Sequence, residues 1–80
     1  MPKTTEKQLQ DKLQDLLVTL RNEAGLRQVD LAKKLHKPQS FVSKYESGER
    51  FLDLPELYIL CQALGVPFVV FAERFEKSLR

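Results

Sequence analysis

The sequence predicts an all-α fold, a compact five-helix domain, on the strength of three observations. Apolar residues recur every three or four positions in five segments of the 80-residue chain, which is the period of an α-helix. Most of these segments begin at a capping residue or a proline, and most end at a glycine. None shows the alternation of polar and apolar residues that indicates a β-strand.

Composition argues against a disordered, membrane-spanning or secreted protein. With 42% hydrophobic and 30% charged residues, the chain is globular rather than disordered. Its longest apolar run, residues 68–72, falls well short of the roughly 18 residues that span a membrane. The opening MPKTTEKQLQ lacks the apolar segment of a signal peptide, and one cysteine allows no internal disulfide. We therefore expect a cytoplasmic protein with no membrane partner.

The first helix has a clear start and end. Thr5 followed three residues later by Gln8 forms a capping-box signature, and Gly25 is suited to end the helix in a left-handed turn. Between them, the helical period selects an apolar stripe of Leu9, Leu13, Leu16, Leu17, Leu20 and Ala24. We expect residues 1–4 to be flexible and residues 5–80 to form a single domain.

Two short helices follow. The second is expected over about residues 28–35, with an inward side of Val29, Leu31, Ala32 and Leu35. The third is expected over about residues 38–47, with Pro38 as its first helical residue and Gly48 as its end.

The last two helices carry the rest of the core. Asp53 and Glu56 cap a fourth helix whose stripe is Leu57, Leu60, Cys61 and Leu64, and Gly65 ends it. Pro67 begins a fifth helix whose inward side is Phe68, Phe71 and Phe75, with Leu79 trailing. This segment has more apolar residues than one face can hide, leaving Val69, Val70 or Leu79 exposed. Such an excess indicates a self-association surface, and we expect a homodimer.

The third helix is unusually polar for so small a protein. On a helical wheel, Val42 and Tyr45 point inward, and the outward positions are Ser40, Ser43, Lys44 and Ser47. Gln39, Phe41 and Glu46 lie on the flanks. A merely solvated helix more often carries paired Glu and Lys, whereas Gln and Ser can bond to base edges. By itself this face favours binding and solvation about equally.

Charge is concentrated around the same segment. Residues 27–50 hold six bases (Arg27, Lys33, Lys34, Lys37, Lys44 and Arg50) and three acids (Asp30, Glu46 and Glu49), although the whole chain carries only +2. A local basic surface indicates a polyanionic partner, although a solvated lysine face is the commoner explanation.

The join between the second and third helices has the length and proline punctuation of a helix-turn-helix, a pattern that generic helical hairpins share. Together with LRNEAGL before it and LPELYILCQALGV after it, QVDLAKKLHKPQSFVSKYESGER resembles the domain of phage repressors, Cro and Xre-type bacterial regulators. The resemblance runs from about Leu17 to Phe71. Its most specific features are Gln28, the Leu31-Ala32 pair, the segment SKYE-GER at residues 43–50 and the segment ALGV at residues 63–66.

The resemblance implies a transcriptional regulator, a repressor of bacterial or phage origin that binds a two-fold operator in double-stranded DNA through the major groove. It implies base contacts from the third helix, at Gln39, Ser40, Ser43 and Lys44. It implies phosphate contacts from Gln28, with further ones available from Arg27, Lys37, Ser47 and Arg50. It implies a structural ion pair between Arg21 and Glu46. Two-fold dimers are usual for this motif.

Three positions depart from the family pattern. His36 stands where glycine is usual in the turn, and histidine tolerates a positive φ at some cost. Arg27 and Lys37 replace the usual hydroxyl caps of the second and third helices. Phe41 occupies a position that is often polar, and two interpretations stay open: packing against the second helix, or contact with a thymine methyl group.

Other functions have less support in the sequence. His36 and Cys61 have no partners at metal-ligand spacing, and no catalytic triad or phosphate-binding glycine loop is visible, so we expect no metal, no cofactor and no enzyme activity. An antitoxin of the same fold remains an alternative, in which the apolar C-terminal segment binds a toxin. So does a protein-interaction module that has lost DNA binding, although its third helix would be acidic or apolar.

Overall fold

The structure, a computed structural model, describes residues 5–80, and the four residues expected to be flexible lie outside this range. Its helices are α1 (Glu6–Glu23), α2 (Gln28–Leu35), α3 (Gln39–Ser47), α4 (Leu54–Leu64) and α5 (Phe68–Ser78). Residues 5–80 contain no β-strand. The all-α class with five helices, predicted from the sequence, is confirmed.

Side-chain caps begin two of the helices. Thr5 Oγ1 accepts a hydrogen bond from the Gln8 amide at 3.2 Å, and Asp53 Oδ1 accepts one from the Glu56 amide at 2.8 Å. Both Gln8 and Glu56 return a bond to the backbone of the capping residue, which completes two capping boxes. These bonds satisfy amides at the first turn that have no partner inside the helix.

The start of α3 differs from expectation in two respects. Pro38 is the cap residue rather than the first helical residue, because its ψ of 155° is extended and helical geometry begins at Gln39. Lys37 is therefore not the cap of α3 but the residue before it. Pro67 likewise precedes α5 instead of beginning it.

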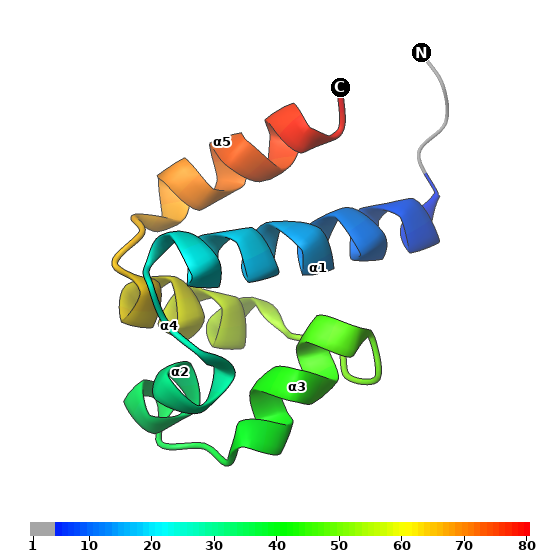
Figure 1. Cartoon of the computed structure of the whole chain (residues 1–80). Coiled ribbons are helices and arrows are strands. Elements are labelled where there is room, and N and C mark those ends of the chain that lie inside the picture. Colours follow the sequence, from blue (N-terminus) through cyan, green and yellow to red (C-terminus); the bar gives the residue numbers. More distant parts are fainter. Residues whose placement is uncertain (1–4) are drawn as a thin grey trace.

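The long helix α1 runs through the middle of the molecule (Figure 1). Helix α5 packs on one side of it, and α3 packs on the other. Helix α4 connects the α3 side of the molecule with the α5 side, since it contacts both α2 and α5. The pair α2 and α3 consequently forms one end of the molecule, remote from α5 in Figure 1.

All five helices contribute to one hydrophobic core. Its buried members are Leu16, Leu17, Leu20, Leu31, Ala32, Val42, Tyr45, Leu60, Cys61, Leu64 and Phe71. Ala24, expected on the buried stripe of α1, is instead exposed, because it is the C-terminal cap beyond the last turn that packs. The excess of apolar residues expected in the last helix is present, with Val69, Val70 and Leu79 exposed by 64%, 39% and 37%.

Within residues 5–80, no single helix is long and apolar enough to cross a membrane. Helices α4 and α5 pass that test of length and composition only as a pair, and they are bent by 106° at their junction.

Tyr45 places a hydroxyl group inside this core. The side chain is only 2% exposed, and its oxygen has no hydrogen-bond partner among the described residues. Burial raises the pKa of the phenol, with the Glu46 carboxylate adding to the shift. Its ring meets Phe41 edge-on at 5.7 Å between centres, so the aromatic body contributes packing that the hydroxyl does not.

We therefore expect Tyr45→Phe to leave the free energy of unfolding unchanged or to raise it by about 1 kcal/mol, since an unsatisfied buried hydroxyl is costly. Tyr45→Leu is the matched control, because it removes the ring and should destabilise clearly. Urea unfolding measures both. A drop of more than about 1 kcal/mol in Tyr45→Phe would show that the hydroxyl contributes a favourable bond.

Candidate nucleic-acid interface

The turn between α2 and α3 is built on a left-handed residue. His36 has φ 56° and ψ 41°, and among residues 5–80 it is the one residue other than glycine with a positive φ. The Lys37 amide then donates to the Ala32 carbonyl at 3.0 Å, closing the end of α2. As the sequence indicated, histidine performs the role that glycine usually has, and the chain is redirected into α3 after three residues.

Helix α3 has one buried side and one open side. Val42 is 0% exposed and Tyr45 is 2% exposed, so these two side chains fix the helix on the core. The outward face of α3, as we define it, comprises the exposed residues Gln39, Ser40, Ser43, Lys44 and Ser47. Within it, the Ser47 hydroxyl donates to the Lys44 carbonyl at 3.1 Å. The face presents amide, hydroxyl and ammonium groups without any carboxylate.

An ion pair joins α1 to the inner flank of α3. Arg21 Nε lies 2.8 Å from Glu46 Oε2, and Arg21 Nη2 lies 3.0 Å from Glu46 Oε1. The two side chains are 13% and 6% exposed. Arg21 Nη1 also donates to the Leu26 carbonyl at 2.9 Å, and hydrogen bonding to Glu46 raises the pKa of the guanidinium. The pair therefore has the two-pronged geometry and extra bonding that buried charges require.

Gln28 extends this pair toward the outward face. Its Nε2 donates to Glu46 Oε1 at 2.9 Å, and its Oε1 accepts from Gln39 Nε2 at 3.4 Å. Arg21, Glu46, Gln28 and Gln39 thus form a continuous chain of hydrogen bonds, the Arg21–Gln39 network. Gln28 was expected to meet a phosphate, and in this structure its side chain is instead half-buried and bonded within the protein.

Arg27 precedes α2 and is paired locally. Its Nε and Nη2 each lie 3.0 Å from an Asp30 carboxylate oxygen, and Asp30 also accepts from the Arg27 amide at 2.9 Å. These bonds lower the pKa of Asp30 to about 2. The arginine side chain makes no cap of its own, as its lack of an acceptor dictates. Asp30 supplies the bond at this helix start, a role that was not expected from the sequence.

A second group of charged side chains, Lys37, Arg50 and Glu56, lies around Phe41. Arg50 donates from Nη1 and Nη2 to the two oxygens of Glu56 at 3.1 and 2.6 Å, and its guanidinium carbon lies 4.8 Å from the centre of the Phe41 ring. Lys37 Nζ lies 5.5 Å from the same ring centre. The hydrogen bonds from Arg50 lower the pKa of Glu56. Glu56 was expected from the sequence only as a cap residue.

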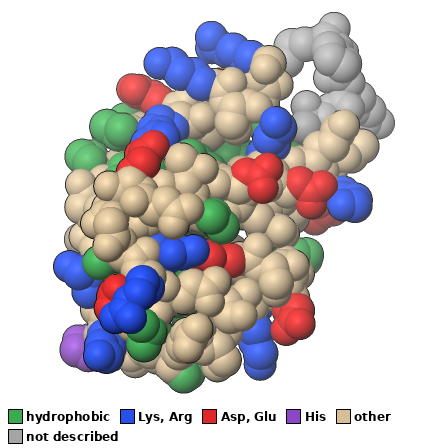
Figure 2. All heavy atoms as spheres, in the orientation of Figure 1, with side chains coloured by type: hydrophobic (Ala, Val, Ile, Leu, Met, Phe, Trp, Pro, Cys, Tyr) green, Lys and Arg blue, Asp and Glu red, His purple; other side chains and the backbone are tan. Residues whose placement is uncertain are grey.

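Basic side chains are prominent at this end of the molecule. Figure 2 shows several Lys and Arg side chains close to the histidine, over the part formed by α2 and its turn. Exposed Lys33, Lys34 and Lys37 belong to this region, and Lys44 stands on the outward face of α3. A surface of this sign attracts a polyanion through long-range electrostatics.

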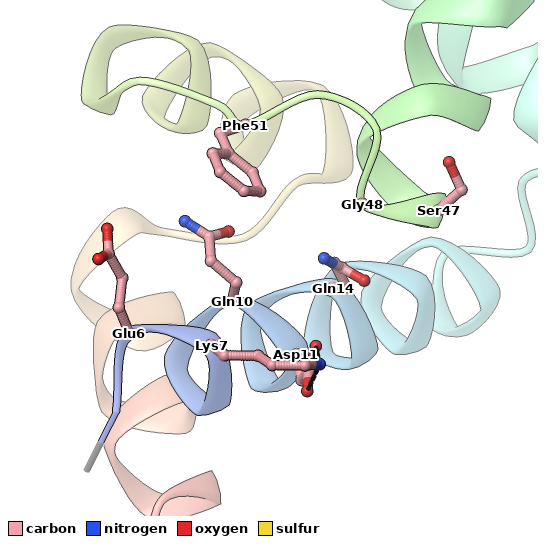
Figure 3. Close-up of a pocket in the computed structure, with 8 residues that line it drawn as sticks. All are labelled: Glu6, Lys7, Gln10, Asp11, Gln14, Ser47, Gly48 and Phe51. Atoms are coloured by element: carbon pink, nitrogen blue, oxygen red, sulfur yellow. Dashed lines mark hydrogen bonds and ion pairs between the residues drawn. The ribbon is translucent and has the colours of Figure 1, made fainter.

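A hollow of about 520 Å³ separates the first turns of α1 from the chain after α3 (Figure 3). Its lining includes Gln14, Gly48 and the exposed ring of Phe51. Gly48 has φ 89°, and a Cβ atom there would lie 2.9 Å from Gln14 Nε2. Glycine is favoured here by the left-handed backbone, whereas the end of the flexible Gln14 side chain could move aside for a Cβ atom.

Among residues 5–80, no group of three or more His, Cys, Asp or Glu side chains is arranged to hold a metal ion.

Two short helices at a three-residue turn, the second carrying a polar outward face, define a helix-turn-helix domain. The profile of the helix-turn-helix family matches residues 17–71, and the chain belongs to this family. No curated protein sequence matches the chain significantly.

Solved structures of helix-turn-helix proteins resemble it over most of its length. The restriction-modification controller protein C.Esp1396I is 31% identical, with 89% of this chain and 91% of that one covered and a TM-score of 0.83. An XRE-family like protein from Pseudomonas syringae pv. tomato str. DC3000 is 39% identical, with 86% and 84% covered and a TM-score of 0.80. The C.Esp1396I tetramer in complex with its natural 35 base-pair operator matches at 31% identity, 88% and 92% coverage and a TM-score of 0.81.

Breaking the Arg21–Glu46 pair should destabilise the fold. We expect Arg21→Ala to lower the free energy of unfolding by about 3–5 kcal/mol, because it leaves a carboxylate that is 6% exposed without its cation. Thermal and urea unfolding measure the decrease. Arg74→Ala is the control, since it breaks the well-exposed pair with Glu23 and should change stability little. Equal stability of Arg21→Ala and wild type would contradict a structural role for the pair.

Proposed function

We propose that this protein is a sequence-specific regulator of transcription that acts in the bacterial cytoplasm. It binds double-stranded DNA through the major groove and represses by occupying a two-fold operator. The observation that carries the proposal is the outward face of α3, whose polar side chains stand on a helix locked from behind by Val42, Tyr45 and the Arg21–Gln39 network. A rigid helix of this kind meets the geometric demand of base reading.

Base choice is assigned to Gln39, Ser40, Ser43 and Lys44 on the outward face of α3, beside which Phe41 is partly buried. An amide can bond adenine at two points, a lysine can bond guanine, and a serine can serve either base. The bond that Gln39 Nε2 donates to Gln28 Oε1 presets the Gln39 amide before DNA binds, so less side-chain freedom is lost on binding.

Affinity independent of sequence is assigned to the surrounding side chains Arg27, Gln28, Lys37, Ser47 and Arg50. Cations and backbone amides at helix starts bind phosphates, and these contacts set the register of the protein on the duplex. Because phosphate contacts release counterions, affinity falls as salt concentration rises. Gln28 reaches a phosphate in this proposal with the amide hydrogen that its bond to Glu46 does not use.

A homodimer supplies the two-fold symmetry. The exposed apolar residues of α4 and α5 support it, namely Leu54, Tyr58, Ile59, Val69 and Val70. Two copies joined through apolar side chains would read half-sites about 34 Å apart. The related C.Esp1396I has been crystallised as a tetramer in complex with its operator, which supports assembly of several copies on DNA.

The division between base and phosphate contacts is testable by two substitutions. On the operator preferred by the wild-type protein, we expect Gln39→Ala to cost roughly 1–3 kcal/mol of binding free energy and to relax preference at one base pair. Arg50→Ala should weaken binding to all sequences alike and reduce the salt slope by about 0.9. Competition binding against every single-base variant measures both, and equally weakened binding to all operators in both proteins would refute the assignment.

The dimer is testable by placing a charge on the apolar surface. We expect Val69→Asp, at a side chain that is 64% exposed, to shift sedimentation toward the monomer without lowering the melting temperature. Thr19→Asp introduces the same charge on the exposed side of α1 and serves as the matched control. A wild-type protein that stays monomeric at high concentration and binds one copy per operator would overturn the dimer.

A further inference from the structure

Phe41 stands on the first turns of α3, and packing alone does not account for it. The ring is only partly buried against the core, on which it meets Tyr45 edge-on. A leucine would fill such a position without exposing an aromatic face. The ring also lies close to two cations, Lys37, which precedes α3, and Arg50, which follows it.

We propose that Phe41 is a positioning residue that holds Lys37 and Arg50 beside α3 for contact with DNA phosphates and takes no part in base choice. The inference rests on the proposed DNA binding. It explains why Lys37 and Arg50 lie close together in the structure although all of α3 separates them in the sequence.

The Phe41 ring is itself held in place. Its edge-to-face contact with Tyr45 has centres 5.7 Å apart and planes at 71°, within the range that aromatic pairs prefer. Tyr45 is anchored in the core, so the Phe41 ring shares the rigidity of α3.

The chain after α3 returns to this ring. The amides of Glu49 and Arg50 both donate to the Lys44 carbonyl, at 2.9 and 3.2 Å, which folds the segment back after Gly48. The Arg50 guanidinium then lies 4.8 Å from the ring centre, within the distance at which an aromatic face attracts a cation. Arginine stacks on such faces better than lysine because its guanidinium is planar.

Glu56 holds Arg50 without using all its donors. Each terminal nitrogen gives one bond to the carboxylate, and Nη1 also points to the Phe51 carbonyl at 3.5 Å. A guanidinium has five N–H groups, so the Nε hydrogen and one on Nη2 remain for a phosphate. Ring and carboxylate together fix the plane in which those donors point.

The residues around Phe41 strengthen its contact with Lys37. A hollow of about 120 Å³ beside the ring is lined by Leu35, Lys37, Phe41, Glu56, Ile59 and Leu60. Its mainly apolar walls lower the local dielectric beside Lys37, which strengthens the attraction between this cation and the ring. Without the ring, Lys37 and Arg50 lose the apolar face that they share and keep only the Glu56 carboxylate between them, so ordering them on DNA costs more side-chain entropy.

The test uses Phe41→Leu, with Phe41→Tyr as the control that keeps the ring, on operators selected by the wild-type protein. We expect Phe41→Leu to weaken binding roughly three- to tenfold on the operator and all its single-base variants alike. The slope of log affinity against log salt should fall by about 0.9 for each phosphate that the variant no longer binds. Phe41→Tyr should retain affinity, base preference and slope.

Two outcomes would overturn the proposal. Relaxed preference at one base pair with an unchanged salt slope would mean that the ring touches a base. Unchanged affinity and slope in Phe41→Leu, with only a lower melting temperature, would mean that the ring serves packing alone. Failure of the wild-type protein to bind any duplex would instead refute the proposed function, so the two failures are distinguishable.

Discussion

The position of α3 depends on one interaction, the ion pair between Arg21 and Glu46. Val42 and Tyr45 are the two buried residues of α3, and they fix the helix on the core. Glu46 lies beside them on the inner flank, and its two bonds to α1 fix the remaining rotation. This rotation sets where each side chain of the outward face points, because side chains on a helix keep fixed angles to one another. The same carboxylate also binds Gln28, so one acid orders α1, α2 and α3 together.

Among residues 5–80, some charges near the candidate interface form ion pairs and others have no ion-pair partner, and the two kinds act differently on DNA. Arg27 with Asp30 and Arg50 with Glu56 are held in defined geometry, and much of their field cancels at a distance. The exposed lysines of α2 and α3 provide most of the remaining positive potential, which acts at longer range and is screened by salt. Attraction of DNA and placement on it are thus assigned to different side chains. Phe41 connects the two sets, since it contacts one lysine and one paired arginine.

Local rules in the sequence were enough to predict the five helices, because periodicity, capping boxes and glycine stops act within a few residues. They placed the start of α3 one residue early, because Pro38 is extended rather than helical. They also placed Ala24 on the buried stripe, although it caps α1 beyond the last turn that packs. The partners of Gln28 and Arg50 could not be predicted from spacing. Glu46 lies 18 residues from Gln28, and Glu56 lies six residues from Arg50 across a loop, so only the folded chain brings them together.

Selection of bound sequences from random duplex DNA by the wild-type protein tests the central claim, that the outward face of α3 reads bases. We expect enrichment of a two-fold symmetric site with half-site centres about 34 Å apart. Uniform recovery of sequences, with no base enriched at any position, would contradict the claim.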